Sequence, residues 1–119
     1  MPSRPQWIRF FYPAFFAAVS AYNAAVAGAY IRALCYYWQV NNCVGIEDDQ
    51  DAMMRICGTD KEDWDKHGST VFGKLFILDG NGLWQQKRAK EEWSRAIEYS
   101  NKSSEKGKLG AYKRWHGNA

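Results

Sequence analysis

Apolar residues recur every four positions in the second quarter of the chain, which predicts a buried amphipathic helix. Val26, Tyr30, Leu34 and Trp38 follow this spacing within AAVAGAYIRALCYYWQ, so they fall on one side of a helix. Asn23 precedes the run and is a favourable N-cap, because its side chain can accept from the free amides of the first turn. Gly28 lowers helix stability, and we expect it to permit close approach of another element.

Two shorter helices follow, separated by a tight turn. QDAMMRIC is expected to begin after Asp48 or Asp49 and to end at Gly58, the residue type favoured just after a helix. Thr59 and Glu62 have the spacing of a capping box, which predicts the start of the next helix, DKEDWDKHGSTVFGK. The interruption between these helices is typical of a helix-turn-helix.

The next segment, LFILDGNGLWQQ, has two short β-like runs around DGNG, a strong hairpin signal. A helix is expected over KRAKEEWSRAIEYS, and the remaining residues are rich in Gly, Ser and Lys. The order helix, short strand, helix, helix, hairpin, helix predicts a mainly α winged helix-turn-helix with a minor β component and a hairpin wing. We assign it to residues 1–100, and a basic flexible tail to residues 101–119.

The composition fits a single globular domain. The chain has 119 residues, of which 46% are hydrophobic and 16% aromatic, enough to fill a core. The three cysteines form no CxxC pair and are expected to be reduced thiols, with Cys35 and Cys57 in the core. Residues 7–40 are mostly apolar, but Arg9, Pro13 and Arg32 interrupt them, so they predict buried core rather than a membrane span.

Charge is distributed unevenly along the chain. From Glu47 to Asp65 there are eight acidic and two basic residues, whereas from Lys74 to the end there are ten basic and five acidic ones. Such asymmetry can orient a charged partner.

An ordered set of segments resembles the YdaU-like family of phage and prophage proteins. The resemblance runs from about Trp7 to Trp115. It is carried by PAFFAAV, GAYIRALCYYW, GIEDDQDAMMRICG, EDW, VFGKLFILDGNGLWQQKRAKEEW and SEKGKLGAYKRW. It implies a winged-helix fold and a phage setting linked to replication, and it supplies no catalytic residues.

No pattern points to catalysis. Two groups of aspartates, around Asp49 and Asp63, could in principle bind metal, but both lie at helix starts, where carboxylates complement the helix dipole. No Ser/His/Asp set, P-loop or dinucleotide motif is present. We therefore expect no enzyme activity, no metal and no cofactor.

Two surfaces are candidate binding sites. The C-terminal part spaces positive charge with aromatic rings, which suits phosphate contact and base stacking. Its residues are Lys87, Arg88, Lys90, Lys102, Lys106, Lys108, Lys113, Arg114 and Trp115. The helix after the tight turn is acidic, which opposes its insertion into DNA and suits a basic protein partner. Its residues are Asp60, Glu62, Asp63 and Asp65.

Two hypotheses follow for a protein of the bacterial host cytoplasm, without membrane contact. The first is a non-enzymatic phage accessory protein that binds nucleic acid with weak specificity through its basic C-terminal region. The alternative is a counter-defence inhibitor of the anti-CRISPR type, which binds a host defence complex through its acidic and aromatic surface.

Overall fold

The computed structural model describes residues 10 and 12–116, with side chains up to Lys102. The chain divides into two compact units. The first is Phe11–Lys90, and the second contains the described residues 10 and 91–116.

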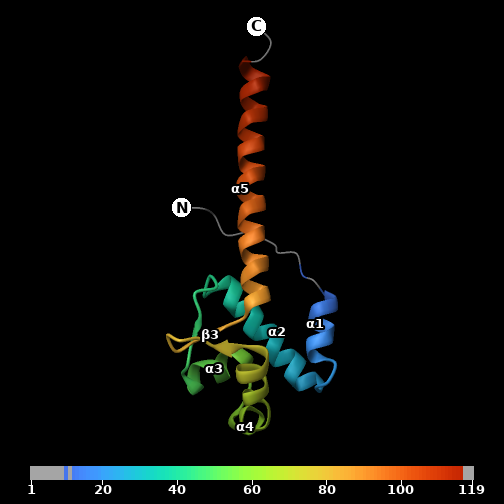
Figure 1. Ribbon diagram of the computed structural model, residues 1–119, viewed down its shortest axis with the longest axis vertical. Coiled ribbons are helices and arrows are strands. Elements are labelled where there is room, and N and C mark those ends of the chain that lie inside the picture. Colours follow the sequence, from blue (N-terminus) through green and yellow to red (C-terminus); the bar gives the residue numbers. More distant parts are fainter. Residues whose placement is uncertain (1–9, 11, 117–119) are drawn as a thin grey trace. The chain divides into compact units, whose positions relative to one another are not determined.

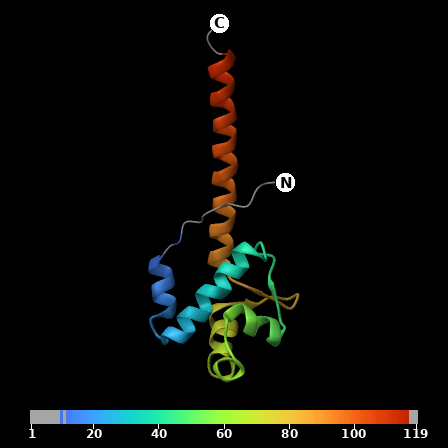
Figure 2. The ribbon, with the colours of Figure 1, turned by 180° about the vertical axis from the view of Figure 1, so that it is seen from behind.

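The first unit is mostly helical and contains a small sheet (Figure 1). Figure 2 shows the same ribbon from behind, and α1 to α4 can be found there by their colours, from blue to yellow-green. Its elements are α1 (Tyr12–Val19), α2 (Ala24–Gln39), β1 (Ile46–Glu47), α3 (Gln50–Cys57), α4 (Lys61–Thr70), η1 (Val71–Leu75), β2 (Ile77–Leu78), β3 (Leu83–Gln85) and the first turn of α5 (Lys87–His116).

The sheet has three antiparallel strands in the order β1-β3-β2. Trp84 at its centre lies opposite Ile46 on one side and Leu78 on the other. The hairpin predicted around DGNG is therefore confirmed, with strands shorter than the apolar runs suggested. The mainly α class with a minor β part is also confirmed.

Side-chain caps define where three helices begin. Asn23 accepts from the N–H of Val26, as predicted, and Asp49 caps α3 by accepting from Asp51 N–H. The predicted Thr59 cap is wrong, because Asp60 caps α4. Thr59 instead helps to end α3, since its N–H and its hydroxyl both donate to the carbonyl of Met54.

The core is built around Phe76, which is fully buried. Its ring meets Tyr30 and Tyr37 edge-on, with centroids 6.0 and 5.6 Å away, and lies 5.3 Å from the ring of Phe72. Such aromatic pairs stabilise beyond the area they bury. Of the residues predicted to face inward from α2, Val26, Tyr30 and Leu34 are buried, and Trp38 is half-buried.

A backbone kink separates α4 from the hairpin. The prediction of one helix as far as Lys74 is wrong, because α4 ends at Thr70 and the chain then leaves helical geometry at Phe72 and Gly73. Gly73 has φ of +140°, which a residue with a side chain rarely adopts. The kink allows Val71, Phe72 and Phe76 all to be buried.

The three cysteines are free. Cys57 is buried as predicted, whereas Cys35 is exposed, contrary to prediction, and Cys43 is buried. Burial raises the pKa of Cys43 to about 12 and that of Cys57 to about 11, so both remain protonated and unreactive at neutral pH.

Helix α5 is longer than its sequence pattern indicates. It begins after Gln86, whose side-chain oxygen accepts from Ala89 N–H at 2.8 Å, and it continues to His116 rather than ending at Ser100. The chain has no proline after Pro13. The isolated glycines at 107 and 110 each weaken a helix by about 1 kcal/mol without stopping it.

Two exposed glycines provide a matched stability test. Gly58 has φ of +69°, and an added Cβ would lie 2.5 Å from the guanidinium carbon of Arg32. Gly28 lies within α2 with nothing within 4 Å of an added Cβ, so the expected close approach is wrong. We expect Gly58→Ala to lower the free energy of unfolding by about 1–2 kcal/mol. Gly28→Ala should raise it by roughly 0.5–1 kcal/mol, as measured by urea unfolding.

The two substitutions are expected to change the free energy of unfolding in opposite directions. Equal destabilisation by both alanines would contradict the left-handed conformation at Gly58 and the open surface at Gly28.

Candidate nucleic-acid interface

Three predicted basic residues lie in the first turn of α5. Lys87, Arg88 and Lys90 are exposed, while Ala89 between them is buried. Two hydrogen bonds attach this turn to α2: Trp38 Nε1 donates to the carbonyl of Ala89 at 2.9 Å, and Gln86 Nε2 donates to the Tyr30 hydroxyl at 2.9 Å. The first unit therefore presents these three cations from a fixed position.

The second unit carries all the remaining predicted basic residues on α5, together with Arg95. Arg95 and Lys102 are exposed. Positions 95, 102, 106 and 113 are separated by seven, four and seven residues. At about 100° per residue they share an arc of about 40° around the helix axis. We call these four positions the basic face of α5.

The other predicted C-terminal residues occupy different sides of α5. Positions 108 and 114 each lie about 120° from position 102, in opposite senses, and position 115 lies about 140° away. Trp115 therefore does not share a face with the residue at position 113. The side chains at 106, 108, 113, 114 and 115 lie outside the described residues.

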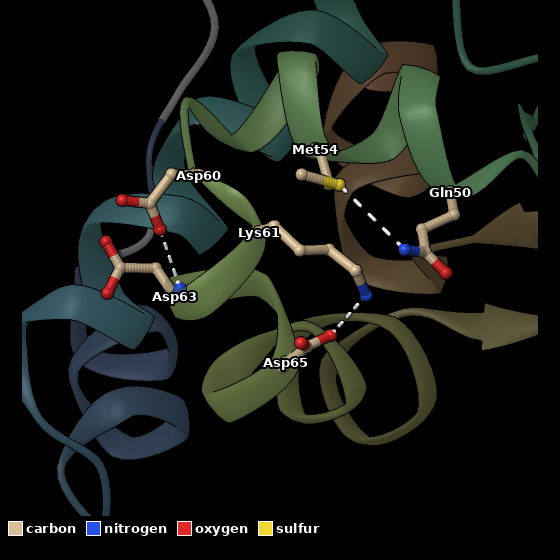
Figure 3. A network of polar contacts seen from close by, with 6 residues as sticks. All are labelled: Gln50, Met54, Asp60, Lys61, Asp63 and Asp65. Atoms are coloured by element: carbon tan, nitrogen blue, oxygen red, sulfur yellow. Dashed lines mark hydrogen bonds and ion pairs between the residues drawn. The ribbon is translucent and has the colours of Figure 1, made fainter.

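All four predicted acidic residues of α4 are exposed. Asp60 accepts from Asp63 N–H at 2.8 Å as the N-cap. Lys61 pairs with Asp65, and Lys66 pairs with Glu62 at 3.1 Å (Figure 3 shows the first of these pairs). Each exposed pair one helical turn apart contributes only about 0.3–0.5 kcal/mol. Local lysines thus offset two of the four carboxylates, and α4 keeps an excess of negative charge.

Carboxylates at the start of α3 are used structurally. Asp49 caps the helix, and Asp48 Oδ1 accepts from Trp84 Nε1 of β3 at 3.1 Å. No group of three or more His, Cys, Asp or Glu residues is arranged as metal ligands within the described part of the chain.

The tip of the hairpin is organised by Asp79 and Gln85. Asp79 Oδ1 accepts from the N–H groups of Asn81 and Leu83, at 2.8 and 3.0 Å, and its Oδ2 accepts from Gln85 Nε2 at 3.0 Å. Gln85 also accepts from the buried Tyr37 hydroxyl at 2.6 Å and donates to the Val44 carbonyl. These side chains link the hairpin to α2. The tip of the hairpin, DGNG, contains no Lys or Arg.

Sequence reasoning did not identify Gln85 as the link between the hairpin and α2. Its partner Asp79 had a usable signal, since aspartate is favoured at the first position of a tight turn. The contacts of Gln85 with Tyr37 and Val44 span 48 and 41 residues, and no local pattern indicates them.

The hairpin should contribute to the pH dependence of stability. Hydrogen bonds from Leu83 N–H and the Gln85 side chain are the main causes that lower the pKa of Asp79 below its ordinary value of 3.8. A lowered pKa adds stability above the ordinary value, and that stability is lost as pH falls through the folded-state value. We expect Asp79→Asn to be less stable than the wild type at pH 7, and the difference to shrink below pH 3.8. Chemical unfolding at several pH values measures this, and a difference that stays constant from pH 7 to pH 3 would argue against the bonded carboxylate.

Comparison with protein-family models, with curated proteins and with solved structures found no match to this chain. Across the described residues, none of the helices combines the length and the apolar character needed to cross a bilayer.

Proposed function

We propose that the protein is a non-enzymatic accessory protein that binds nucleic acid through α5. Helix α5 carries nine basic and four acidic residues, an excess of five positive charges, whereas the whole chain has a formal net charge of +3. Positive charge is therefore concentrated on this one element, and the rest of the chain is slightly negative. This concentration is the observation that carries the proposal, because phosphate neutralisation dominates affinity for nucleic acids.

The first unit is proposed to be a winged helix-turn-helix. The order α2, β1, α3, α4, β2, β3 and the strand order β1-β3-β2 support it. A turn of three residues, Gly58 to Asp60, joins α3 and α4, as in helix-turn-helix motifs.

This unit is not well suited to reading bases in the usual way. The second helix of such a motif enters the major groove with Arg, Lys, Asn or Gln, whereas α4 exposes Asp60, Glu62, Asp63 and Asp65. Phosphates would repel these carboxylates. Binding through α5 avoids that repulsion and gives weak sequence specificity, since phosphate contacts position a protein without reading bases.

The biological setting is proposed from the family resemblance alone. A YdaU-like protein would act in phage replication or regulation, in the cytoplasm of the bacterial host. No catalytic residue set or cofactor is part of the proposal.

The test is binding of fluorescently labelled DNA by the full chain, followed by anisotropy as salt is raised. We expect measurable binding at about 0.05 M salt that weakens by roughly 100-fold at 0.2 M, as for about four neutralised phosphates. No binding at low salt would refute the proposal.

The alternative is a counter-defence inhibitor that binds a basic surface of a host defence complex through α4. The exposure of all four carboxylates supports it, while the two lysine pairs reduce the charge available to a partner. Replacing Asp60, Glu62, Asp63 and Asp65 by their amides would weaken such an inhibitor and leave DNA binding unchanged or strengthened.

A further inference from the structure

We propose that the basic face of α5, at positions 95, 102, 106 and 113, binds the phosphate backbone of double-stranded DNA rather than single strands. The inference rests on the proposed function and specifies the form of nucleic acid and the side of the helix that meets it. It depends on the helical path of residues 91–116 and on the register of charged residues along it.

The spacing of the basic face suits a rigid polyanion. With a rise of 1.5 Å per residue, the intervals are about 10.5, 6 and 10.5 Å, and the face spans about 27 Å. Duplex DNA of that length, about eight base pairs, presents roughly 16 phosphates at one per 1.7 Å of its axis. A rigid duplex presents several phosphates without a loss of its own conformational entropy. A single strand would lose conformational entropy when it is aligned along a helix.

The aromatic positions argue against a single strand. Proteins that bind single strands place stacking rings along the cationic groove. On α5, position 112 lies about 80° and position 115 about 140° from position 102. Only Tyr99, which is exposed, lies beside the basic face. A single ring is not enough to stack several consecutive bases.

Repulsion between neighbouring lysines on the basic face favours binding of an anionic partner. Lys102 and Lys106 stand four residues apart on α5, and like charges at this spacing destabilise a helix. A bound phosphate between them would relieve the repulsion. Arg95 is exposed on the same side, but the exposed Glu91 and Glu98 lie only about 20° and 40° from position 102. The excess of positive charge on this side is therefore at positions 102, 106 and 113.

The experiment compares a 16-base-pair duplex with a 16-nucleotide single strand, using the full chain. We expect tighter binding of the duplex, by about tenfold or more. The plot of log affinity against log salt should have a slope of about −3.6, for four phosphates at about 0.9 each. Two duplexes of unrelated sequence should bind equally.

Two double variants with the same charge change identify the face. Lys102→Gln with Lys106→Gln removes two cations from it, and Lys108→Gln with Arg114→Gln removes two from other sides of α5. We expect the first pair to weaken duplex binding by roughly 10- to 100-fold and to reduce the salt slope by about 1.8. The second pair should change affinity by less than about threefold. Tyr99→Ala should also stay within about threefold for duplex, because no base stacks on it.

The outcomes separate this inference from the proposed function. Wild-type protein that binds neither form at low salt refutes both. Equal losses in the two double variants, tighter binding of the single strand, or a tenfold loss with Tyr99→Ala would overturn the duplex inference and leave nucleic-acid binding in place. Far-UV circular dichroism of all variants checks that α5 keeps its helical content.

Discussion

A chain ending at Ser100 is expected to lose at least about 100-fold in affinity for DNA at roughly 0.1 M salt. The truncation removes Lys102, Lys106, Lys108, Lys113 and Arg114 and only one acidic residue, Glu105. Each lost phosphate contact removes the entropy gained from counterion release, so the loss should diminish as salt rises. Anisotropy titrations of the two proteins at several salt concentrations measure it.

A full-length control separates charge from length. Replacing the same five cations with glutamine keeps all 119 residues and should reproduce the loss. Thermal unfolding of the truncated chain should match that of the full chain, since Phe11–Lys90 forms a compact unit with its own core. Binding by the truncated protein within about threefold of the full chain would contradict the assignment to α5 beyond Ser100 and point to Lys87, Arg88 and Lys90 in its first turn.

Phe76→Ala is expected to cause the largest loss of stability of any substitution considered, about 3–5 kcal/mol. The ring is fully buried and touches the rings of Tyr30, Tyr37 and Phe72. Its removal leaves a cavity at the junction of α2 and η1. Domains of this size are stable by only about 5–15 kcal/mol, so partial unfolding at 37 °C is expected. Urea unfolding at 25 °C measures the change.

Phe16→Ala is the matched control, because it deletes the same ring from a side chain that is 69% exposed on α1. It should change stability by less than about 0.5 kcal/mol. Where the alanine at 76 prevents folding, Phe76→Leu keeps most of the volume and should cost less than about 1.5 kcal/mol. Similar losses for the alanines at 76 and 16 would refute the position of the core.

The elements that sequence predicted well are those coded by neighbouring residues. The four-residue spacing and the Asn23 cap located α2, Gly58 located the end of α3, and DGNG located the hairpin. Each of these signals depends on interactions within one or two turns of the chain, so a single sequence suffices to find them.

The features missed by sequence depend on tertiary contacts or on competition between local signals. Thr59 and Asp60 could both cap α4, and the involvement of Thr59 with the end of α3 decides between them. The kink at Gly73 follows from burying Phe72 and Phe76 together. The length of α5 was underestimated because Gly and Ser suggested a loop, whereas the chain lacks the proline that would end a helix.

The sequence predicted which residues form the candidate interface but not how they are arranged around α5. Basic residues and aromatic rings near the C-terminus suggested one mixed site. Helical spacing instead places positions 95, 102, 106 and 113 together and position 115 elsewhere on α5. Periodicity could have revealed this arrangement only if the helix had been expected beyond Ser100.

We propose that DNA binds to α5 and not to α4. The most direct measurement is a titration of the ¹⁵N-labelled full chain with a 16-base-pair duplex, followed through backbone amide resonances. We expect changes at residues 95–113 that reverse on adding salt, with the resonances of residues 60–66 unchanged. Changes centred on residues 60–66, with 95–113 unaffected, would contradict it.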